Sequence, residues 1–395
     1  MKRNKLTIQQ SLIGSWNLST QFSEIISRPR KWHRLLLILV SLICLSQLEA
    51  QNLPNRPARV PTPNDDLVSF QVNDDQSATL RLYAPNAKSV ELSGDLKAVK
   101  IDRADNGVWT MTTAPHIDPS AYRYYFTVDG MKVNDPKNPM VADFRPMVDI
   151  VPKGETMFWQ KKNVPHGLLS IVYYESAATK TTRRMYVWTP PGYISNGKKL
   201  PVLYLMHGAG DNDTNWPLQG KAGWILDNLT AEKKIVPMVV VMPDGSIPVE
   251  TFAHDLGSNI VPYIEANFRV QADTRHRAIA GLSMGGFETL ETLLDYPGMF
   301  SYVSVMSSGW FSRGPDALAK FDERVKSVAP ILRANIKYFK FTTGGQSDLA
   351  VRFTPQTRAI FTKYGIESDF SEMDGGHSMY VWRNDLHFFT QKIFK

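Results

Sequence analysis

Apolar and polar residues follow two different patterns along this chain of 395 residues. Between about residues 65 and 150 they alternate in short stretches, and Asn/Asp-Gly turn signals such as Asp105-Asn106-Gly107 and Asp129-Gly130 separate the stretches. Such alternation predicts short strands with one buried face. The clearest stretches are residues 79–84, 89–92, 108–111 and 122–128. This region is therefore predicted to be a β-sandwich of about ninety residues.

From Leu168 onward the apolar runs are longer, and helical patterns fill the gaps between them. An antiparallel pair is predicted at residues 170–174 and 184–188. Buried strands are predicted at 200–206, 236–242, 277–282, 302–306 and 338–343, and helices at about 221–234, 255–268, 284–296, 315–333 and 355–364. Strands alternating with helices predict an α/β fold, a mostly parallel sheet with helices on both faces. We expect this domain to span residues 165–395.

The first 64 residues fit neither pattern. Basic residues precede the apolar run from Leu35 to Leu45, and Leu48-Glu49-Ala50 closes the stretch. The run is too short to span a bilayer and is typical of a secretory signal peptide cleaved near Ala50. Residues 51–64 are proline-rich and polar, which predicts a linker.

Signal cleavage changes what the composition implies. The formal net charge of +7 falls to about +2, because residues 1–50 contain seven of the 45 basic and two of the 38 acidic residues. We therefore expect no nucleic-acid partner and no membrane attachment after cleavage. Cys44 is the only cysteine and leaves with the signal, so the mature chain has no disulfide and no thiolate site. These properties suit a secreted or periplasmic bacterial protein.

The sequence Gly281-Leu282-Ser283-Met284-Gly285 joins a predicted buried strand to a predicted helix. Glycines two residues on either side of a serine allow strand and helix backbones to approach closely, while a strained turn lifts the hydroxyl clear of the sheet. Ser283 is therefore predicted to be a nucleophile at the carboxyl end of a strand, where open α/β sheets place their sites.

A serine nucleophile needs a base, an acid that orients it, and donors for the oxyanion. The chain order nucleophile, acid, histidine favours His377, which lies in a glycine loop after the last predicted strand. Asp348 follows the strand 338–343 and is the preferred acid, whereas Asp374 is too near His377 along the chain to face it easily. The oxyanion donors are predicted to be the backbone amides of Met284 and Ala209.

Several side chains near these positions have more ordinary explanations. His207 ends a strand and is expected to hold the oxyanion loop instead of acting as a base. Trp216, Trp310 and Trp382 fall near the predicted site, and Trp216 and Trp382 are the candidates for contact with an aromatic acid or a sugar ring. Core packing explains a tryptophan more often.

Residues 165–395 resemble the esterase-D-type α/β-hydrolases, especially the feruloyl and acetyl-xylan esterases of carbohydrate esterase family one. The landmarks are Thr189–Tyr193, His207–Gly210, Gly281–Gly286, Gly345–Asp348 and Gly376-His377 with Trp382-Arg383. The resemblance implies the triad and oxyanion donors named above, and neither a metal nor an organic cofactor. The sandwich resembles early-set immunoglobulin-like modules of the glycogen-binding type, through Asn106–Trp109, Tyr122–Tyr124 and Val128–Pro136.

The expected function is therefore a secreted serine esterase that removes feruloyl or acetyl groups from a plant polysaccharide such as xylan. The same resemblance also fits siderophore esterases of the enterochelin type. A non-catalytic carbohydrate-binding protein is the alternative from another class, and the complete triad argues against it. Since every predicted catalytic residue follows Leu200, hydrolysis of a small ester is expected not to need the sandwich, unless the sandwich packs over the cleft. The oligomeric state is left open.

Overall fold

The computed structural model describes residues 59–142, 145–311 and 315–395. Pro63–Lys395 form one compact unit, which the description below concerns. The predicted signal peptide and most of the predicted linker lie outside the described residues. No helix within the described ranges is long and apolar enough to cross a membrane.

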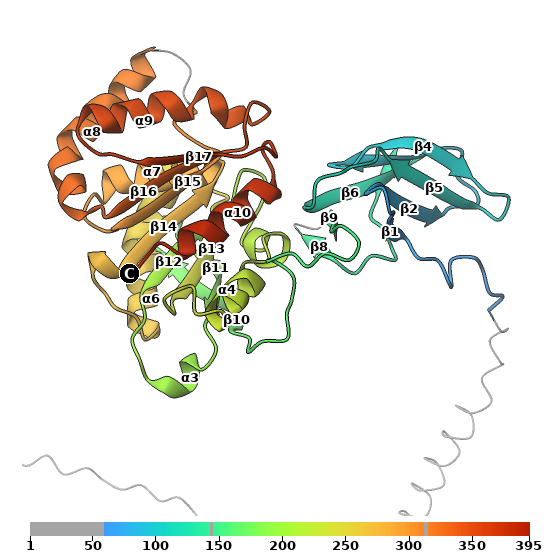
Figure 1. Ribbon diagram of the computed structural model, residues 1–395, viewed down its shortest axis with the longest axis horizontal. Helices are drawn as coiled ribbons and strands as arrows, with labels where there is room; N and C mark the ends of the chain where they lie inside the picture. Colours follow the sequence, from blue (N-terminus) through green and yellow to red (C-terminus); the bar gives the residue numbers. More distant parts are fainter. Residues whose placement is uncertain (1–58, 143–144, 312–314) are drawn as a thin grey trace, which may run out of the picture. The chain divides into compact units, whose positions relative to one another are not determined.

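The first part of this unit is the predicted sandwich, built from two antiparallel sheets (Figure 1). One sheet has the order β1 (Phe70–Val72), β2 (Ala78–Tyr83), β5 (Val108–Thr113), β4 (Ala98–Arg103). The other has the order β3 (Val90–Gly94), β6 (Ala121–Val128), β9 (Arg145–Asp149), β8 (Val141–Ala142), and β7 (Met131–Val133) pairs with β6. The alternation pattern did not predict β1, β4 and β7 to β9. The strands β1 and β7 to β9 have only two to five residues, and β4 is largely exposed.

Alternation along the strands builds the core of the sandwich. On β5 the side chains of Trp109, Met111 and Thr113 are buried, while the residues between them are partly exposed. Met111 shares the core cluster with Leu80, its register partner on the neighbouring strand β2, and with Phe126 on β6 of the other sheet. The indole Nε1 of Trp109 donates a hydrogen bond of 3.0 Å to the carbonyl oxygen of Ala84. Trp109 is therefore a core residue of the sandwich.

The second part is an eight-stranded sheet with one antiparallel strand, β11, among parallel neighbours. Its order is β10 (Leu168–Ser176), β11 (Thr181–Thr189), β13 (Val239–Pro243), β12 (Val202–Met206), β14 (Arg277–Leu282), β15 (Tyr302–Met306), β16 (Tyr338–Thr343), β17 (Asp369–Glu372). The chain passes from β12 to β13 on one side and then to β14 on the other. The carboxyl ends of β12 and β14 are therefore adjacent at a topological switch point.

Helices cover both faces of this sheet, so the predicted α/β architecture is confirmed. Helices α4 (Ala222–Ala231) and α10 (Met379–Thr390) contact each other on one face (Figure 1). The other face packs against α5 (Val249–Asp255), η2 (Leu256–Ile260), α6 (Val261–Asn267), α7 (Met284–Asp295), α8 (Pro315–Asn335) and α9 (Thr354–Lys363). Short helical turns complete the chain: α3 (Tyr193–Asn196), η1 (Asn215–Gln219), η3 (Thr274–His276) and η4 (Leu349–Arg352).

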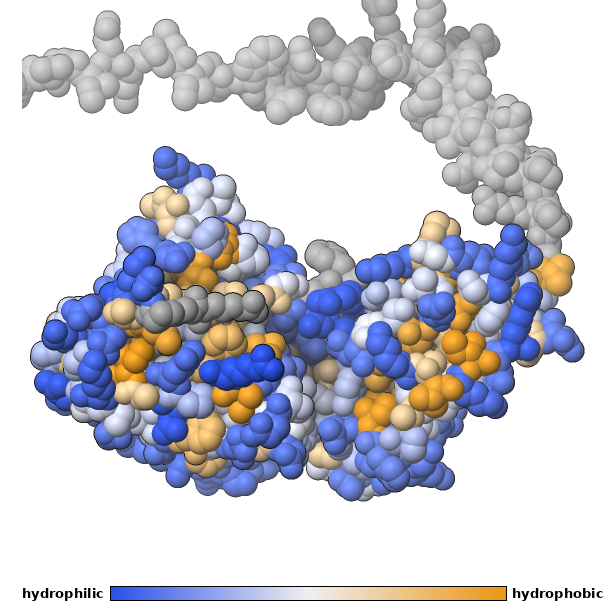
Figure 2. Space-filling view, turned by 90° about the horizontal axis from the view of Figure 1, so that it is seen from above, coloured by the Kyte–Doolittle hydropathy of each residue, from blue (hydrophilic) through white to orange (hydrophobic). Residues whose placement is uncertain are grey.

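The period of two along each strand divides the apolar residues between the two faces. On β12, Val202 and Tyr204 join the cluster under α5 to α9, whereas Leu203 and Leu205 join the cluster under α4 and α10. All five residues of this strand are buried. The continuous apolar runs in the sequence thus reflect strands that are covered on both sides. On the outer surface, Figure 2 shows mostly hydrophilic residues with apolar residues in small scattered groups.

Candidate active site

Ser283 stands at the sharp turn between β14 and α7. Its backbone has φ 51° and ψ −116°, a left-handed region that a residue with a side chain rarely adopts. Two hydrogen bonds with the end of β15 and the residues just after it hold this conformation. The amide of Ser283 donates to the carbonyl oxygen of Met306 at 2.8 Å, and the hydroxyl of Ser308 donates to the carbonyl oxygen of Ser283 at 2.6 Å. Ser308 belongs to no recognisable motif, so its role could not be predicted from the sequence.

Glycine is required around this turn because backbones approach very closely. A Cβ atom on Gly281 would lie 2.1 Å from the carbonyl oxygen of Gly285, and one on Gly285 would lie 2.4 Å from the carbonyl oxygen of His207. Neither contact can be relieved by a side chain, because both involve main-chain atoms. The two glycines therefore allow α7 to start directly against β14 and against the end of β12.

His377 lies between Ser283 and Asp348. Its Nε2 is 2.9 Å from the Ser283 hydroxyl oxygen, and its Nδ1 is 2.8 Å from Oδ1 of Asp348. His377 lies in the loop that connects β17 to α10. In this loop the amide of Gly376 donates to the carbonyl oxygen of Gly344 at 2.8 Å, which ties it to the loop after β16 that carries Asp348. The ring of Trp382 packs edge-on against the imidazole, with 5.0 Å between ring centroids. This geometry leaves the imidazole little freedom to turn.

Asp348 is buried, with 1% of its surface exposed. Its carboxylate accepts hydrogen bonds from the amides of Ala350 and Gly344, at 2.9 and 2.8 Å, in addition to the bond with His377. Burial alone would raise the pKa of this carboxyl group, but the hydrogen bonds from His377 and the amides outweigh it and lower the pKa to about 2. The carboxylate is therefore ionised at neutral pH. Asp374, the alternative acid, is exposed and lies near Gly345.

The loop after β12 comes directly against the serine turn. A Cβ atom on Gly208 would lie 3.3 Å from the Cβ of Ser283 and 2.7 Å from the side chain of Leu282. The imidazole of His207 is buried and bridges two loops, since Nε2 accepts from the amide of Gly245 at 2.8 Å and Nδ1 lies 2.9 Å from the carbonyl oxygen of Gly208. The predicted oxyanion loop, with Ala209 at its exposed tip, is thus held beside Ser283.

The three tryptophans near the site differ in what they can contact. Trp216 is 1% exposed, and its Nε1 donates to the carbonyl oxygen of Met206 at 2.9 Å, so it supports the end of β12 from inside. The prediction that Trp216 contacts substrate is therefore corrected, because no face of its ring is accessible. Trp310 is also buried and stacks on Phe321. Trp382 is 7% exposed and contacts the imidazole of His377.

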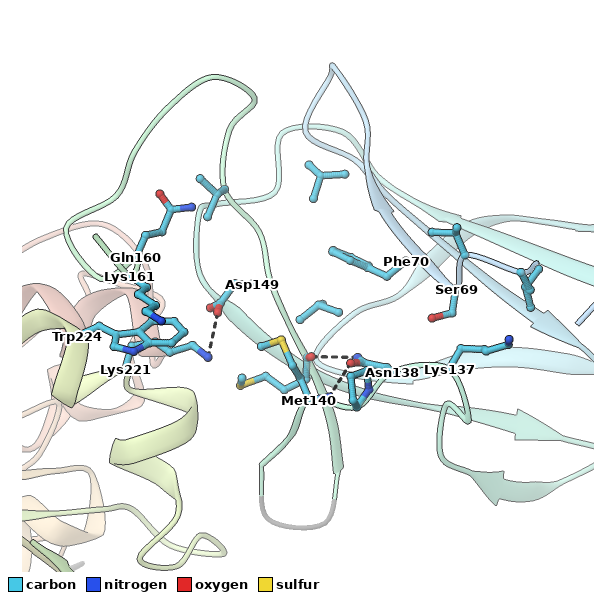
Figure 3. Close-up of a pocket in the computed structure, with 17 residues that line it drawn as sticks. Ser69, Phe70, Lys137, Asn138, Met140, Asp149, Gln160, Lys161, Lys221 and Trp224 are labelled. Carbon is cyan, nitrogen blue, oxygen red and sulfur yellow. Dashed lines mark hydrogen bonds and ion pairs between the residues drawn. The ribbon is translucent and has the colours of Figure 1, made fainter. Parts of the chain in front are cut away.

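A pocket of about 650 Å³ lies elsewhere, where strands of the sandwich meet α4. Figure 3 shows Phe70, Asn138 and Met140 on one side of it and Lys221 and Trp224 on the other, with Lys221 directed at Asp149. None of the residues that line it belongs to the group around Ser283. The pocket is therefore separate from the candidate active site.

Comparison with known protein families gives two matches. The Esterase family, described as "Putative esterase", matches residues 176–391, which is more than half of the chain. Carbohydrate-binding module 48, described as the isoamylase N-terminal domain, matches residues 68–143. The first match covers β11 to β17 of the eight-stranded sheet and all the candidate catalytic residues, and the second covers most of the sandwich.

Two curated relatives are long enzymes of which this chain matches only a part. An endo-1,4-beta-xylanase/feruloyl esterase of Xylanibacter ruminicola is 33% identical over 349 residues, which is 82% of this chain and 46% of that protein. Endo-1,4-beta-xylanase Y of Acetivibrio thermocellus is 27% identical over 215 residues, 48% of this chain and 19% of that protein. The chain therefore spans less than half of the length of either relative.

Two solved structures illustrate the similarity of the fold. A ferulic acid esterase from Anaeromyces mucronatus has a TM-score of 0.52 at 22% identity and covers 60% of this chain and 93% of its own. The enterobactin esterase of Shigella flexneri has a TM-score of 0.60 at 18% identity and covers 82% of this chain and 94% of its own. At these identities the likeness concerns the fold alone.

The sharp turn at Ser283, the α/β fold around it and the match to the family model all indicate the same family. The chain belongs to the Esterase family, with an α/β-hydrolase fold and an N-terminal region of the carbohydrate-binding module 48 type.

Proposed function

We propose that this member of the Esterase family is a carboxylic-ester hydrolase that works through a covalent acyl-enzyme. Ser283 is the nucleophile, His377 the general base and acid, and Asp348 the carboxylate that orients the base. The observation that carries the proposal is the pair of contacts made by one imidazole, 2.9 Å to the serine oxygen and 2.8 Å to the aspartate oxygen. A serine hydroxyl is a weak nucleophile unless a base removes its proton as it attacks. Nε2 of His377 is within reach of that proton.

In the first half of the reaction, the Ser283 oxygen attacks the ester carbonyl carbon while its proton passes to Nε2 of His377. The resulting imidazolium then protonates the leaving alkoxide as the bond from carbon to oxygen breaks, which leaves the acyl group on Ser283. In the second half, water gives its proton to Nε2 and attacks the acyl carbon, and the serine leaves with that proton. Asp348 keeps Nδ1 protonated and stabilises the imidazolium, and it does not itself take the proton.

The negative charge that develops on the carbonyl oxygen requires donors placed in advance. We assign this role to the backbone amides of Met284 and Ala209. Met284 begins α7, so its amide has no partner within the helix and the helix dipole favours negative charge there. Ala209 is at the exposed tip of the loop that contacts Ser283 through Gly208. Each donor contributes roughly 3 kcal/mol of transition-state stabilisation in hydrolases of this type.

For the substrate we propose a feruloylated xylan. The support is the relative whose name combines xylanase and feruloyl esterase, since its likeness extends over both the sandwich and the hydrolase region. A polymeric substrate also agrees with the export signal expected from the pattern of residues 1–50. Acetylated xylan is the second acyl polysaccharide to consider.

A siderophore triester is the competing substrate. The enterobactin esterase resembles 82% of this chain, more than the 60% covered by the ferulic acid esterase, so it matches beyond the hydrolase region. Both candidates are carboxylic esters whose acyl part carries a phenolic ring, and both would use the same triad. The fold therefore leaves the choice to a direct comparison of substrates.

The test is a comparison of kcat/KM for three substrates under identical conditions: feruloylated arabinoxylan oligosaccharide, acetylated xylan oligosaccharide and enterobactin. Chromatography of the released acid measures each rate, and Ser283→Ala is the matched blank. We expect kcat/KM for the feruloyl ester to exceed that for enterobactin by at least tenfold, about 1.4 kcal/mol in the transition state. A preference for enterobactin would replace the polysaccharide by the siderophore, and turnover that persists in Ser283→Ala would remove the proposed mechanism.

A further inference from the structure

Asp211 is a buried carboxylate only two residues beyond Ala209. Its side chain is 5% exposed, and its amide donates to the carbonyl oxygen of Gly208 at 3.3 Å, which closes the loop that carries Ala209. A carboxylate so buried destabilises the fold unless cations and hydrogen bonds compensate its charge. The position of the loop therefore depends on which groups surround Asp211.

The compensating cations come from the sandwich and not from the hydrolase sheet. Arg123 on β6 forms an ion pair with Oδ1 of Asp211, and Arg145 on β9 lies 3.4 Å from the same oxygen. The side chain of Arg123 is 16% exposed, whereas that of Arg145 is 41% exposed, so water screens Arg145 more. From the hydrolase side, Asn215 donates to Oδ2 at 2.8 Å. Arg123 is therefore the more buried of the two cations.

A second route joins the sandwich to the same loop. Asp149, at the end of β9, accepts a hydrogen bond of 2.8 Å from Arg383 of α10 and also lies 3.4 Å from Lys221, as Figure 3 shows for the lysine. Arg383 in turn donates to the carbonyl oxygen of Gln219, whose side chain accepts from Asn215 at 3.0 Å. Polar contacts thus run from β9 through α10 and η1 back to Asn215, which binds Asp211.

We propose that Arg123 is a positioning residue for the ester hydrolysis, which holds the Ala209 amide in place through its ion pair with Asp211. The proposal rests on the function proposed above, because it concerns the oxyanion donors of that reaction. It changes the expected role of the sandwich. Instead of being dispensable for small esters, the sandwich supplies part of the support for the oxyanion loop.

The physical reason is the steep distance dependence of oxyanion stabilisation. A donor is effective only when it lies about 2.7–3.1 Å from the developing oxyanion. A small shift of the loop therefore reduces the stabilisation of the transition state more than that of the ground state. Gly208 and Gly210 give the loop backbone freedom, and Gly210 has φ 77°. The loop therefore needs a fixed anchor beyond its second glycine, and the Asp211 carboxylate is that anchor.

The test is a double-mutant cycle on kcat in the full chain, with Arg123→Gln, Asp211→Asn and the double variant, and a small soluble feruloyl ester as substrate. Arg103→Gln is the matched control, because Arg103 is an exposed arginine on β4 that binds the carbonyl oxygen of Pro85 within the sandwich. We expect each single variant to lower kcat by roughly tenfold or more with KM changed less than about threefold, since the lost contact acts on the transition state. Arg123→Lys should recover part of the rate.

The double variant separates one shared contact from two independent effects. If Arg123 acts through Asp211, the double variant should be no slower than the slower single variant. Multiplied losses of kcat would overturn the proposal, as would an Arg123→Gln variant that lowers the melting temperature while kcat stays at the value of the Arg103→Gln control. The second result would show an ion pair that only joins the sandwich to the rest of the unit.

The proposal and the function it rests on fail differently. The double-mutant cycle requires that the wild-type protein hydrolyses the feruloyl ester and that the Ser283→Ala variant does not. Loss of that serine dependence contradicts the proposed function. Retained serine dependence with an unaffected Arg123→Gln variant contradicts the positioning role alone.

Discussion

The buried carboxylate of Asp348 and the imidazole of His377 are joined by a hydrogen bond of 2.8 Å, although 29 residues separate them in the sequence. Because the pKa of Asp348 is lowered to about 2, the carboxylate is ionised and accepts a hydrogen bond from the protonated Nδ1 of His377. Nε2 then carries a lone pair directed at Ser283, 2.9 Å away. The tautomer that a general base requires thus follows from the environment of the acid.

The first prediction compares the two aspartates that were considered for the role of the acid, Asp348 and Asp374. Asp348→Asn should lower kcat on the order of 10²-fold or more, because the amide no longer compensates the imidazolium or fixes its tautomer. Asp374→Asn should change kcat less than about twofold, since Asp374 is exposed and outside the hydrogen-bonded group. Steady-state kinetics on a small ester measures both. The reverse ranking would make Asp374 the acid.

The second prediction concerns pH. A histidine accepts a proton from serine only when it is neutral, and imidazoles gain a proton within about pH 5–8. We therefore expect kcat/KM to fall on acidification through this range, for an ester whose chemical step is rate-limiting. Asp348 should add no second fall above about pH 3, because its carboxyl group titrates near 2. A flat profile between about pH 5 and 8 would remove His377 from the role of base.

The third prediction tests the close approach of backbones at the serine turn. Gly285→Ala should lower the free energy of unfolding by about 1–3 kcal/mol, because the added methyl group meets the carbonyl oxygen of His207. Gly298→Ala is the control, since its nearest neighbour would be a side-chain carbon of Ile331 at 3.6 Å. Denaturant unfolding of the two variants gives the comparison. Equal stabilities would mean that the end of β12 and the start of α7 are less tightly packed than described.

The fourth prediction follows from the burial of Trp216. Trp216→Phe removes the donor to the carbonyl oxygen of Met206 and should destabilise the fold by about 1–3 kcal/mol. KM for a feruloyl ester should stay within about twofold of the wild type, because the ring does not reach the substrate. Thermal unfolding and steady-state kinetics test the two parts together. A large rise in KM at unchanged stability would restore Trp216 to the substrate site.

Much of the fold could be predicted from the sequence because buried parallel strands leave long apolar runs. The strands β12 to β16 were located in this way, and the elbow motif then located Ser283. β17 was missed because it is an edge strand of four residues, none of them fully buried, so Asp369–Glu372 shows no apolar pattern. The helix α5–η2–α6 starts earlier than predicted, at Val249 instead of residue 255.

Site residues could be predicted where a local sequence pattern marks them. They could not be predicted where the site depends on contacts between distant segments. Glycine loops after strands indicated His377 and Asp348, and the structure brings both to Ser283. The role of Trp216 could not be predicted, because the sequence alone does not show whether a tryptophan side chain is buried in a core or lies at a binding site. The ion pair between Arg123 and Asp211 joins residues 88 positions apart, and an arginine in a strand pattern gives no sign of its partner.

The account is tested most directly by rapid acid quench of the enzyme during turnover of a small feruloyl ester, followed by mass spectrometry of its peptides. We predict one added feruloyl group, located on Ser283 and absent from Ser283→Ala, whose kcat should fall roughly 10³-fold or more while the protein stays folded. Turnover at the wild-type rate in Ser283→Ala, or a feruloyl group attached to another residue, would contradict the account.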